Sequence, residues 1–293
     1  MLKPNSVLLA SALTAVAFLL SACGGGQDRQ VIQNKGSDTL VNVAQAWAEA
    51  YQKIDPNTVV AVSGGGSGTG IAALINGTVD IANSSRAMKA KEVKLAKDRG
   101  HDPIRHVVGY DALAVYLHAD NPLNEISIPQ LAEVYGDGGS FTKWTDLGVE
   151  VPGCKNQEIV VISRQNNSGT YAYFRKVILG IDDFRLGTRD LHGSKDVAEL
   201  VEKTPCAIGY SGLAYVTDHL KLACVAQQTG GDCTSPTVAT ASNGSYPIAR
   251  PLFMYTSGEP EGYVGEYLSW IKSKQGQCII VNKGYAPASE VSC

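Results

Sequence analysis

The chain has 293 residues, of which 44% are hydrophobic and 18% are charged, and its formal net charge is −3. This length suits one large or two ordinary domains, and the ordinary apolar content excludes intrinsic disorder, collagen and coiled coil. No block of lysine and arginine stands out, so the sequence gives no sign of a nucleic-acid-binding face.

The N-terminus has the order of an export signal. Lys3 precedes an apolar run from Val7 to Leu20, and the sequence Leu20-Ser21-Ala22-Cys23 follows. A charged, then apolar, then small-residue order is typical of a signal peptide, which we expect over residues 1–22. The apolar run is too short to cross a membrane comfortably.

The end of this signal resembles a bacterial lipobox, in which the cysteine becomes the lipidated first residue of the mature protein. It therefore predicts a lipid anchor on Cys23 and a protein exported to the bacterial cell envelope, facing the periplasm or the cell surface. An ordinary signal peptide with a chance cysteine is the alternative. Residues 23–30 contain three consecutive glycines and are expected to form a flexible tether.

The other six cysteines fit an exported chain, because an even number in that setting suggests up to three disulfides. Sequence alone allows 15 pairings of six cysteines. Proximity favours Cys224 with Cys233 and Cys278 with Cys293, which leaves Cys154 with Cys206. No C-x-x-C pair or Cys/His cluster occurs, so we expect no metal site and no redox-active dithiol.

Hydrophobic periodicity predicts alternating strands and helices through the N-terminal third. In chain order we expect a strand at 31–36, a helix from 40, a strand at 58–62, a helix through 72–75 and a strand at 79–82. This alternation indicates an α/β fold with a parallel sheet.

The rest of the chain continues with strands and helices and shows no tandem repeat. We expect a strand at 111–118, a helix around 130–135, a strand at 159–162, a helix at 171–179, strands at 207–210 and 250–255, and a final helix at 262–274. The mixed charges of residues 89–99 are typical of a solvated helix face.

One local pattern occurs three times between a strand and the start of a helix, as Ser37-Asp38-Thr39, Ser67-Gly68-Thr69 and Ser168-Gly169-Thr170. Serine and threonine at such places can simply cap free backbone N–H groups. A helix N-terminus also suits an anion, and in an open α/β sheet these turns lie where ligands bind. The recurrence favours three turns that converge on one tetrahedral anion.

Two arginines follow predicted strands beside these turns. Arg164 lies four residues before Ser168, and Arg86 follows Ser84-Ser85. A guanidinium is the natural bidentate partner of phosphate or sulfate, so both are candidate ligands. A surface ion pair is the alternative for each of them.

Asp38 is unexpected at an anion site. A carboxylate repels a bound anion unless the anion carries a proton that it can donate. Phosphate is partly protonated at neutral pH and sulfate is not, so Asp38 would select phosphate over sulfate. The alternative is that Asp38 caps its own helix.

Four motifs occur in order along the chain. They are Gly36-Ser37-Asp38-Thr39-Leu40, Gly66-Ser67-Gly68-Thr69-Gly70, Thr78-Val79-Asp80-Ile81 and Arg164-Gln165-Asn166-Asn167-Ser168-Gly169-Thr170. This set resembles the phosphate-binding proteins of Pst-type ABC importers, over nearly the whole mature chain. The resemblance implies a two-lobed periplasmic-binding-protein fold of the second type, with phosphate bound dehydrated in a cleft between lobes joined by crossing strands.

With the crossings near 111–117 and 250–255, lobe I would combine residues 28–112 with 251–293, and lobe II would be residues 113–250. The resemblance implies that both lobes contact the ligand, through Thr39, Ser67, Arg164, Ser168, Gly169 and Thr170. We add Ser37 to this set. Where the best-studied branch of the family has an Asp proton acceptor, this chain has Ser85 followed by Arg86. The acceptor is therefore open, and Asp38 is our candidate.

These features predict high-affinity binding of inorganic phosphate and its delivery to the membrane permease of an ABC importer. We expect a lipid-anchored monomer without cofactor, metal or enzymatic activity. Another oxyanion (sulfate, molybdate or arsenate), an envelope phosphate sensor or scavenger, and a hydrolase are the alternatives. The hydrolase is disfavoured because Gly65-Gly66-Ser67-Gly68-Thr69 lacks the last glycine of G-x-S-x-G and no histidine lies in a triad context.

Overall fold

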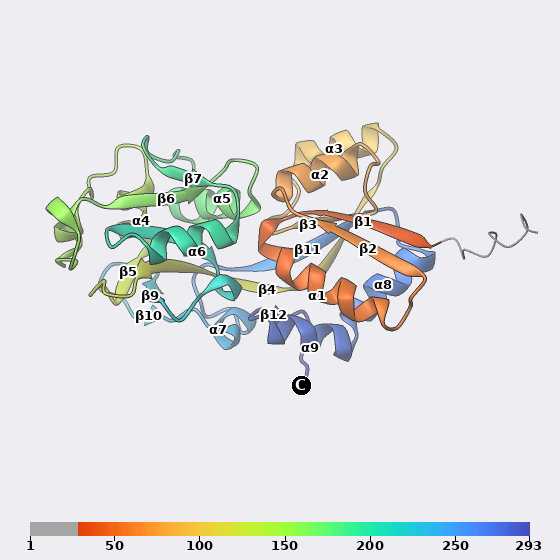
Figure 1. Cartoon of the computed structure of the whole chain (residues 1–293). Helices are drawn as coiled ribbons and strands as arrows, with labels where there is room; N and C mark the ends of the chain where they lie inside the picture. Colours follow the sequence, from red (N-terminus) through yellow and green to blue (C-terminus); the bar gives the residue numbers. More distant parts are fainter. Residues whose placement is uncertain (1–28) are drawn as a thin grey trace, which may run out of the picture.

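The computed structural model describes residues 29–293, so the predicted signal peptide, Cys23 and most of the tether lie outside the described residues. The chain forms two α/β bodies side by side, connected by long strands (Figure 1). Within the described part of the chain, no helix is both long and apolar enough to span a bilayer.

The first body is built on three parallel strands with helices on both faces. Strand β1 (Gln30–Gly36) pairs in parallel with β2 (Thr58–Ser63) and with β3 (Ile81–Ser84). The helices that follow these strands are α1 (Val41–Gln52), α2 (Ser67–Ile75) and α3 (Ala90–Asp98). The predicted strand–helix alternation is confirmed: α1 connects β1 to β2 and α2 connects β2 to β3, as the crossovers of a parallel sheet require.

Two antiparallel strands join the bodies. Strand β4 (Pro103–His118) pairs with β11 (Ala249–Ser257) from Ala249 opposite Ala112 to Ser257 opposite Pro103. Beyond this stretch β4 continues into the second body, where it pairs with β8 (Ala207–Gly212) and β9 (Leu220–Ala226). The strand predicted at 111–118 is only the second half of β4, because residues 103–110 are less completely buried and lack the continuous apolar run.

The second body carries the sheet order β4-β8-β6-β7 with short flanking strands. Its strands are β5 (Glu125–Ser127), β6 (Val160–Arg164), β7 (Arg189–Leu191), β8 (Ala207–Gly212), β9 (Leu220–Ala226) and β10 (Cys233–Thr234). Its helices are α4 (Ile128–Tyr135), α5 (Gly169–Phe174), α6 (Ser194–Glu202) and α7 (Val238–Ser242). The helix predicted at 171–179 is α5 continued by one π-helical turn, Arg175–Leu179.

The C-terminal segment returns to the first body and contains two helices where the sequence predicted one. Helix α8 (Gly262–Lys272) ends at Ser273, and α9 (Lys274–Asn282) and β12 (Ala286–Pro287) follow. The chain turns at Ser273 because its backbone is extended there and its hydroxyl caps α9 at Gly276 N. The backbone of Gly276 also lies against the Ile271 carbonyl, where a Cβ would come within 2.3 Å.

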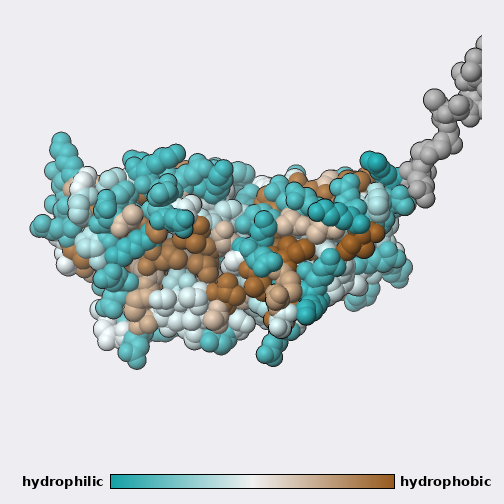
Figure 2. Space-filling view, turned by 60° about the horizontal axis from the view of Figure 1, so that its bottom comes forward, coloured by the Kyte–Doolittle hydropathy of each residue, from teal (hydrophilic) through white to brown (hydrophobic). Residues whose placement is uncertain are grey.

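Each body has its own hydrophobic core. Ile32, Trp47 and Tyr267 belong to the first core, and Trp144 and Phe174 belong to the second. Figure 2 shows polar side chains at both ends of one face, with apolar side chains gathered nearer its middle. Two cores joined by two strands are the arrangement expected of a hinged pair. The division into lobe I (28–112 with 251–293) and lobe II (113–250) stays a prediction, with residue 28 outside the described residues, and we keep the two names below.

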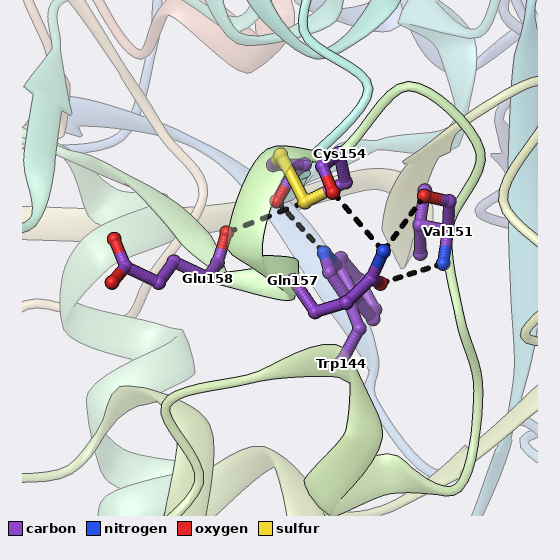
Figure 3. Close-up of a disulfide and its surroundings, with 6 residues drawn as sticks. Trp144, Val151, Cys154, Gln157 and Glu158 are labelled. Atoms are coloured by element: carbon purple, nitrogen blue, oxygen red, sulfur yellow. Dashed lines mark hydrogen bonds between the residues drawn. A yellow bond between two sulfur atoms is a disulfide. The ribbon is translucent and has the colours of Figure 1, made fainter.

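The structure pairs the six cysteines as their spacing favoured, as Cys154–Cys206, Cys224–Cys233 and Cys278–Cys293. The first bridge fastens the loop before β6 to the start of β8 (Figure 3). Trp144 Nε1 donates to the Cys206 carbonyl at 3.1 Å, and Gln157 Nε2 donates to the carbonyls of Val151 and Cys154 at 3.1 and 3.0 Å. The bridge is therefore part of a hydrogen-bonded corner of lobe II.

We expect the Cys154→Ser/Cys206→Ser double variant to lose about 4 kcal/mol of unfolding free energy, because this bridge restricts a long loop of the unfolded chain. The bridged residues are 52 apart, against 9 for Cys224 and Cys233. The matched Cys224→Ser/Cys233→Ser variant should lose only about 3 kcal/mol. Urea unfolding of both variants measures the difference, and a larger loss for the short loop would contradict this account.

Candidate functional site

Five buried hydroxyl side chains meet where the two lobes face each other. Ser37 Oγ donates to Ser85 Oγ at 3.0 Å, and Ser67 Oγ lies 3.3 Å from the same atom. Thr39 Oγ1 and Thr170 Oγ1 are 3.0 Å apart. Each of the five side chains is at most 1% exposed. We call this set the hydroxyl niche.

The parallel sheet of lobe I places three of its members. Ser37 follows β1 and Ser85 follows β3, so they leave the same edge of the sheet, and Ser67 begins α2. Gly36 allows β1 and β3 to approach, because a Cβ there would lie 2.2 Å from the Asn83 carbonyl. Ser37 N donates to that same carbonyl at 2.9 Å, which fixes the start of the loop.

The third turn brings lobe II against these hydroxyls. Ser168 Oγ caps α5 by accepting from Thr170 N at 3.1 Å and Tyr171 N at 3.4 Å. A Cβ on Gly169 would lie 2.2 Å from Ser67 Oγ and 2.6 Å from Ser85 Oγ, so α5 begins directly on the niche.

The three Ser-x-Thr turns therefore differ in what their first hydroxyl does. Capping explains only Ser168. Ser37 makes no cap, and Ser67 Oγ accepts from Ser85 N at 3.0 Å instead. Two of the three turns thus direct their serine hydroxyls into the niche rather than onto their own helix.

Further contacts hold the lobes together beside the niche. Gly68 N donates to the Asn167 carbonyl at 2.9 Å, and Asn167 Nδ2 donates to the Gly65 carbonyl at 3.0 Å. Tyr215 donates its hydroxyl to the Asp38 carbonyl at 2.6 Å, and burial raises the pKa of this phenol to about 12, so it stays a donor. The structure is that of lobes in contact across the cleft.

Arg164 is buried and faces Asp38 across the cleft. Its Nη2 donates to Asp38 Oδ2 at 3.3 Å and to the His192 carbonyl at 2.6 Å, and its Nη1 donates to Ser194 Oγ at 3.0 Å. Burial lowers the pKa of Arg164, and the Asp38 charge opposes that shift. The Arg164 guanidinium is thus held in lobe II, and its hydrogen bond to lobe I goes to Asp38.

Asp38 does not cap its own helix. Its Oδ1 accepts from Gly65 N at 2.9 Å, and its Oδ2 accepts from Arg164. Each carboxylate oxygen keeps one lone pair for a further donor. Asp38, next to Ser37 and Thr39 in the chain, thus links the two lobes through Arg164 and can still accept further hydrogen bonds.

Among the described residues, the Arg86 guanidinium contacts Glu92 and the Ala87 carbonyl and none of the niche hydroxyls. Its Nη1 and Nη2 each donate to a Glu92 carboxylate oxygen at 2.8 Å. Burial opposes ionisation of Glu92, but these hydrogen bonds and the Arg86 charge together lower its pKa. Arg86 therefore forms an ion pair, as in the alternative given above. Glu92 is six residues further along, beyond a turn, so the sequence did not indicate it as the partner.

The structure adds a buried ion pair that the sequence did not single out. Arg250 and Asp111 lie at the crossing strands, at most 1% exposed, with Arg250 Nε and Nη2 at 3.1 and 2.8 Å from Asp111 Oδ2. Arg250 Nη2 also donates to Thr39 Oγ1 at 3.3 Å and to Thr170 Oγ1 at 3.0 Å. Arg250 is therefore the cation in direct contact with the niche. The sequence did contain a signal for this pair, because Asp111 and Arg250 are each a charged residue beside an apolar run within a strand.

The electrostatics of the site suit an anion held by donors. Burial raises the pKa of Asp111, although the Arg250 charge and hydrogen bonds oppose that shift. Among the described residues, Asp111 Oδ1 has no hydrogen-bond partner. The charges of Arg164 and Arg250 are nearly balanced by those of Asp38 and Asp111. An anion in the niche would therefore be stabilised mainly by hydrogen-bond donors: the hydroxyls, the start of α5 and the Arg250 guanidinium.

The site offers little to a metal or to a nucleophilic reaction. Within residues 29–293, no niche hydroxyl hydrogen-bonds to a histidine or a carboxylate, so none is activated as a nucleophile. Glu125, Cys224 and Cys233 lie close together elsewhere, but both sulfurs belong to a disulfide and cannot act as thiolate ligands.

Comparison with known proteins agrees with this geometry. A family model described as a PBP superfamily domain matches residues 22–275. The phosphate-binding protein PstS of Pseudomonas aeruginosa is 32% identical over 267 residues, which cover 87% of this chain and 82% of that protein. The chain belongs to the PstS family of the PBP superfamily.

Another relative and a solved structure are similar to this chain over most of their length. Protein SphX of Synechococcus elongatus is 33% identical over 87% of this chain and 76% of its own. A phosphate ABC transporter substrate-binding protein from Clostridium perfringens, solved with bound phosphate, is 26% identical with a TM-score of 0.77 and covers 89% of this chain and 100% of its own. The predicted periplasmic-binding-protein fold is confirmed.

Proposed function

We propose that this protein binds inorganic phosphate in the hydroxyl niche and delivers it to the membrane permease of an ABC importer. The observation that carries the proposal is the convergence of five buried hydroxyls and the Arg250 guanidinium from both lobes. The names of the PstS relatives and the bound phosphate of the Clostridium perfringens structure support it. The chain is a binding protein and not an enzyme.

Each residue has a defined role in this proposal. Ser37, Thr39, Ser67, Ser85 and Thr170 donate hydroxyl hydrogen bonds. The backbone of Gly169 adds an N–H donor at the start of α5, where Ser168 caps the next N–H groups. Arg250 supplies the positive charge next to the ligand. Arg164 and Asp38 lock the lobes around it.

Asp38 is our proposed acceptor for the ligand's proton. It directly precedes Thr39 in the niche, and its two oxygens each retain a free lone pair. Protonated phosphate can donate a hydrogen bond to this acceptor, whereas sulfate carries no proton to donate and would meet the Asp38 carboxylate without one. Selection between the two anions would follow from that difference.

A calorimetric titration of the phosphate-stripped protein with phosphate and then sulfate at neutral pH tests the proposal. We expect one-to-one phosphate binding and no response to sulfate, and we expect Asp38→Asn to gain sulfate binding. Silence with phosphate together with sulfate or molybdate binding would overturn the choice of ligand. Silence with all three would overturn the niche as an anion site.

The location proposed for the protein is extracytoplasmic, which suits its three disulfides. We further propose that the protein is a monomer, held in the cell envelope by a lipid on Cys23. The tether of residues 23–30 would separate the folded part from the membrane. Mass spectrometry of the mature N-terminus would reveal a diacylglyceryl cysteine. An unmodified N-terminus away from Cys23 would contradict the anchor.

A further inference from the structure

A cavity of about 610 Å³ adjoins the niche. Residues 85–89 and Arg105 form its lobe I wall. Helix α5, the turn after it and Arg250 form its lobe II wall. Ser85 and Arg250 line the cavity and also contact the niche, so the two are direct neighbours. We call it the vestibule.

Among residues 29–293, those that line the vestibule include cations and no carboxylate. Its charged lining residues are Arg86, Lys89, Arg105, Arg175, Lys176 and Arg250. Three of these cations form ion pairs with acids that do not line the vestibule: Arg86 with Glu92 at 2.8 Å, Arg175 with Asp183 at 2.6 Å and Arg250 with Asp111 at 2.8 Å.

The other three cations are uncompensated. Lys89, Arg105 and Lys176 are exposed, and the described part of the chain provides no ion-pair partner for any of them. Lys89 and Arg105 belong to lobe I and Lys176 to lobe II, so the vestibule is positive on both sides of the cleft. This local charge contrasts with the net charge of −3 for the whole chain.

The aromatic rings of the vestibule are already in use by the protein. Arg105 lies over the Phe253 ring at 5.5 Å, Arg250 lies over the Tyr173 ring at 5.6 Å, and Tyr171 stacks on Phe184 at 4.5 Å. The vestibule therefore offers charge rather than a stacking surface. A small multivalent oxyanion fits this chemistry better than an aromatic phosphate ester.

We propose that the vestibule is a second, weaker phosphate-binding site that captures the anion from solution and passes it to the niche. This inference rests on the proposed function of the niche. A chain of net negative charge repels a phosphate dianion at long range, and a cationic entrance reverses that repulsion where the anion must arrive. Steering of this kind raises the association rate and weakens as salt is added.

Stopped-flow measurement of phosphate association, over a range of salt concentrations, tests the vestibule. We expect the Lys89→Gln/Arg105→Gln/Lys176→Gln variant to bind phosphate about tenfold more slowly at low salt, with much less salt dependence and a dissociation rate within about twofold of the unmodified protein. A decrease in the association rate alone is the signature of steering.

The matched control is Lys53→Gln/Lys155→Gln/Lys274→Gln, which removes the same charge at three exposed positions that do not line the vestibule. It should keep the unmodified association rate to within about twofold. Equal rates in the vestibule variant and the control would refute the vestibule while leaving the niche intact. Failure of the unmodified protein to bind phosphate would refute the proposed function and, with it, this inference.

Discussion

Gly169→Ala is expected to weaken phosphate binding about hundredfold while the protein stays folded. The added Cβ would lie 2.2 Å from Ser67 Oγ and 2.6 Å from Ser85 Oγ, and these hydroxyls are held by Ser85 N and Ser37. Overpacking of a close contact costs about 1–3 kcal/mol, and 1.4 kcal/mol corresponds to tenfold in affinity. Because the clash lies between the lobes, it acts on their closure, and calorimetric titration with phosphate measures it.

Gly100→Ala is the matched control for this substitution. Gly100 has a φ of +83° and nothing within 4 Å of an added Cβ, so alanine there strains the backbone without touching the cleft. It should cost about 1 kcal/mol of stability and leave the phosphate affinity unchanged. A Gly169→Ala protein with an affinity near that of the unmodified protein would show that α5 does not close on the ligand.

Arg250→Met should cost about 3–5 kcal/mol of unfolding free energy and remove phosphate binding, because it leaves the Asp111 carboxylate buried and unpaired. Burial already raises the pKa of Asp111. Its protonated form is thus favoured in the folded state, and the stability of the variant relative to the unmodified protein should rise as the pH falls from 7 to 4. Urea unfolding at a series of pH values measures both effects.

The double variant Arg250→Met/Asp111→Asn separates stability from binding. With no unpaired charge left at position 111, it should regain most of the stability lost by Arg250→Met. It should not regain phosphate affinity, because the donor to Thr39 and Thr170 is still missing. Recovery of phosphate binding in the double variant would show that Arg250 acts only as the partner of Asp111.

The sequence predicted the features that depend on local chemistry. Periodicity and turn residues placed the parallel strands of lobe I, and the repeated Ser-x-Thr turns drew attention to Ser37, Ser67 and Ser168. The disulfide pairing also followed from spacing, since two of the bridges join cysteines 9 and 15 residues apart. In each case the determining interaction lies within a short stretch of chain or repeats visibly along it.

The sequence could not predict the features that depend on distant contacts. Arg250 and Asp111 are 139 residues apart, and only the pairing of β4 with β11 brings them together. Arg164 and Asp38 are 126 apart, so the partner of Arg164 depends on how the lobes meet. The role of Arg86 was predicted from its position after β3, while the turn toward Glu92 decides its actual contact.

The hydroxyl niche as the phosphate site is the central claim, and the phosphate affinity of Thr39→Val/Thr170→Val tests it most directly. Valine keeps the shape of threonine but removes the two hydroxyls that contact each other and Arg250. We predict at least about a hundredfold weaker phosphate binding, as expected when two buried donors to a charged group are lost. The control Thr142→Val/Thr217→Val, at two exposed positions outside the niche, should bind normally. Unchanged affinity in the niche variant would contradict the account and place phosphate elsewhere.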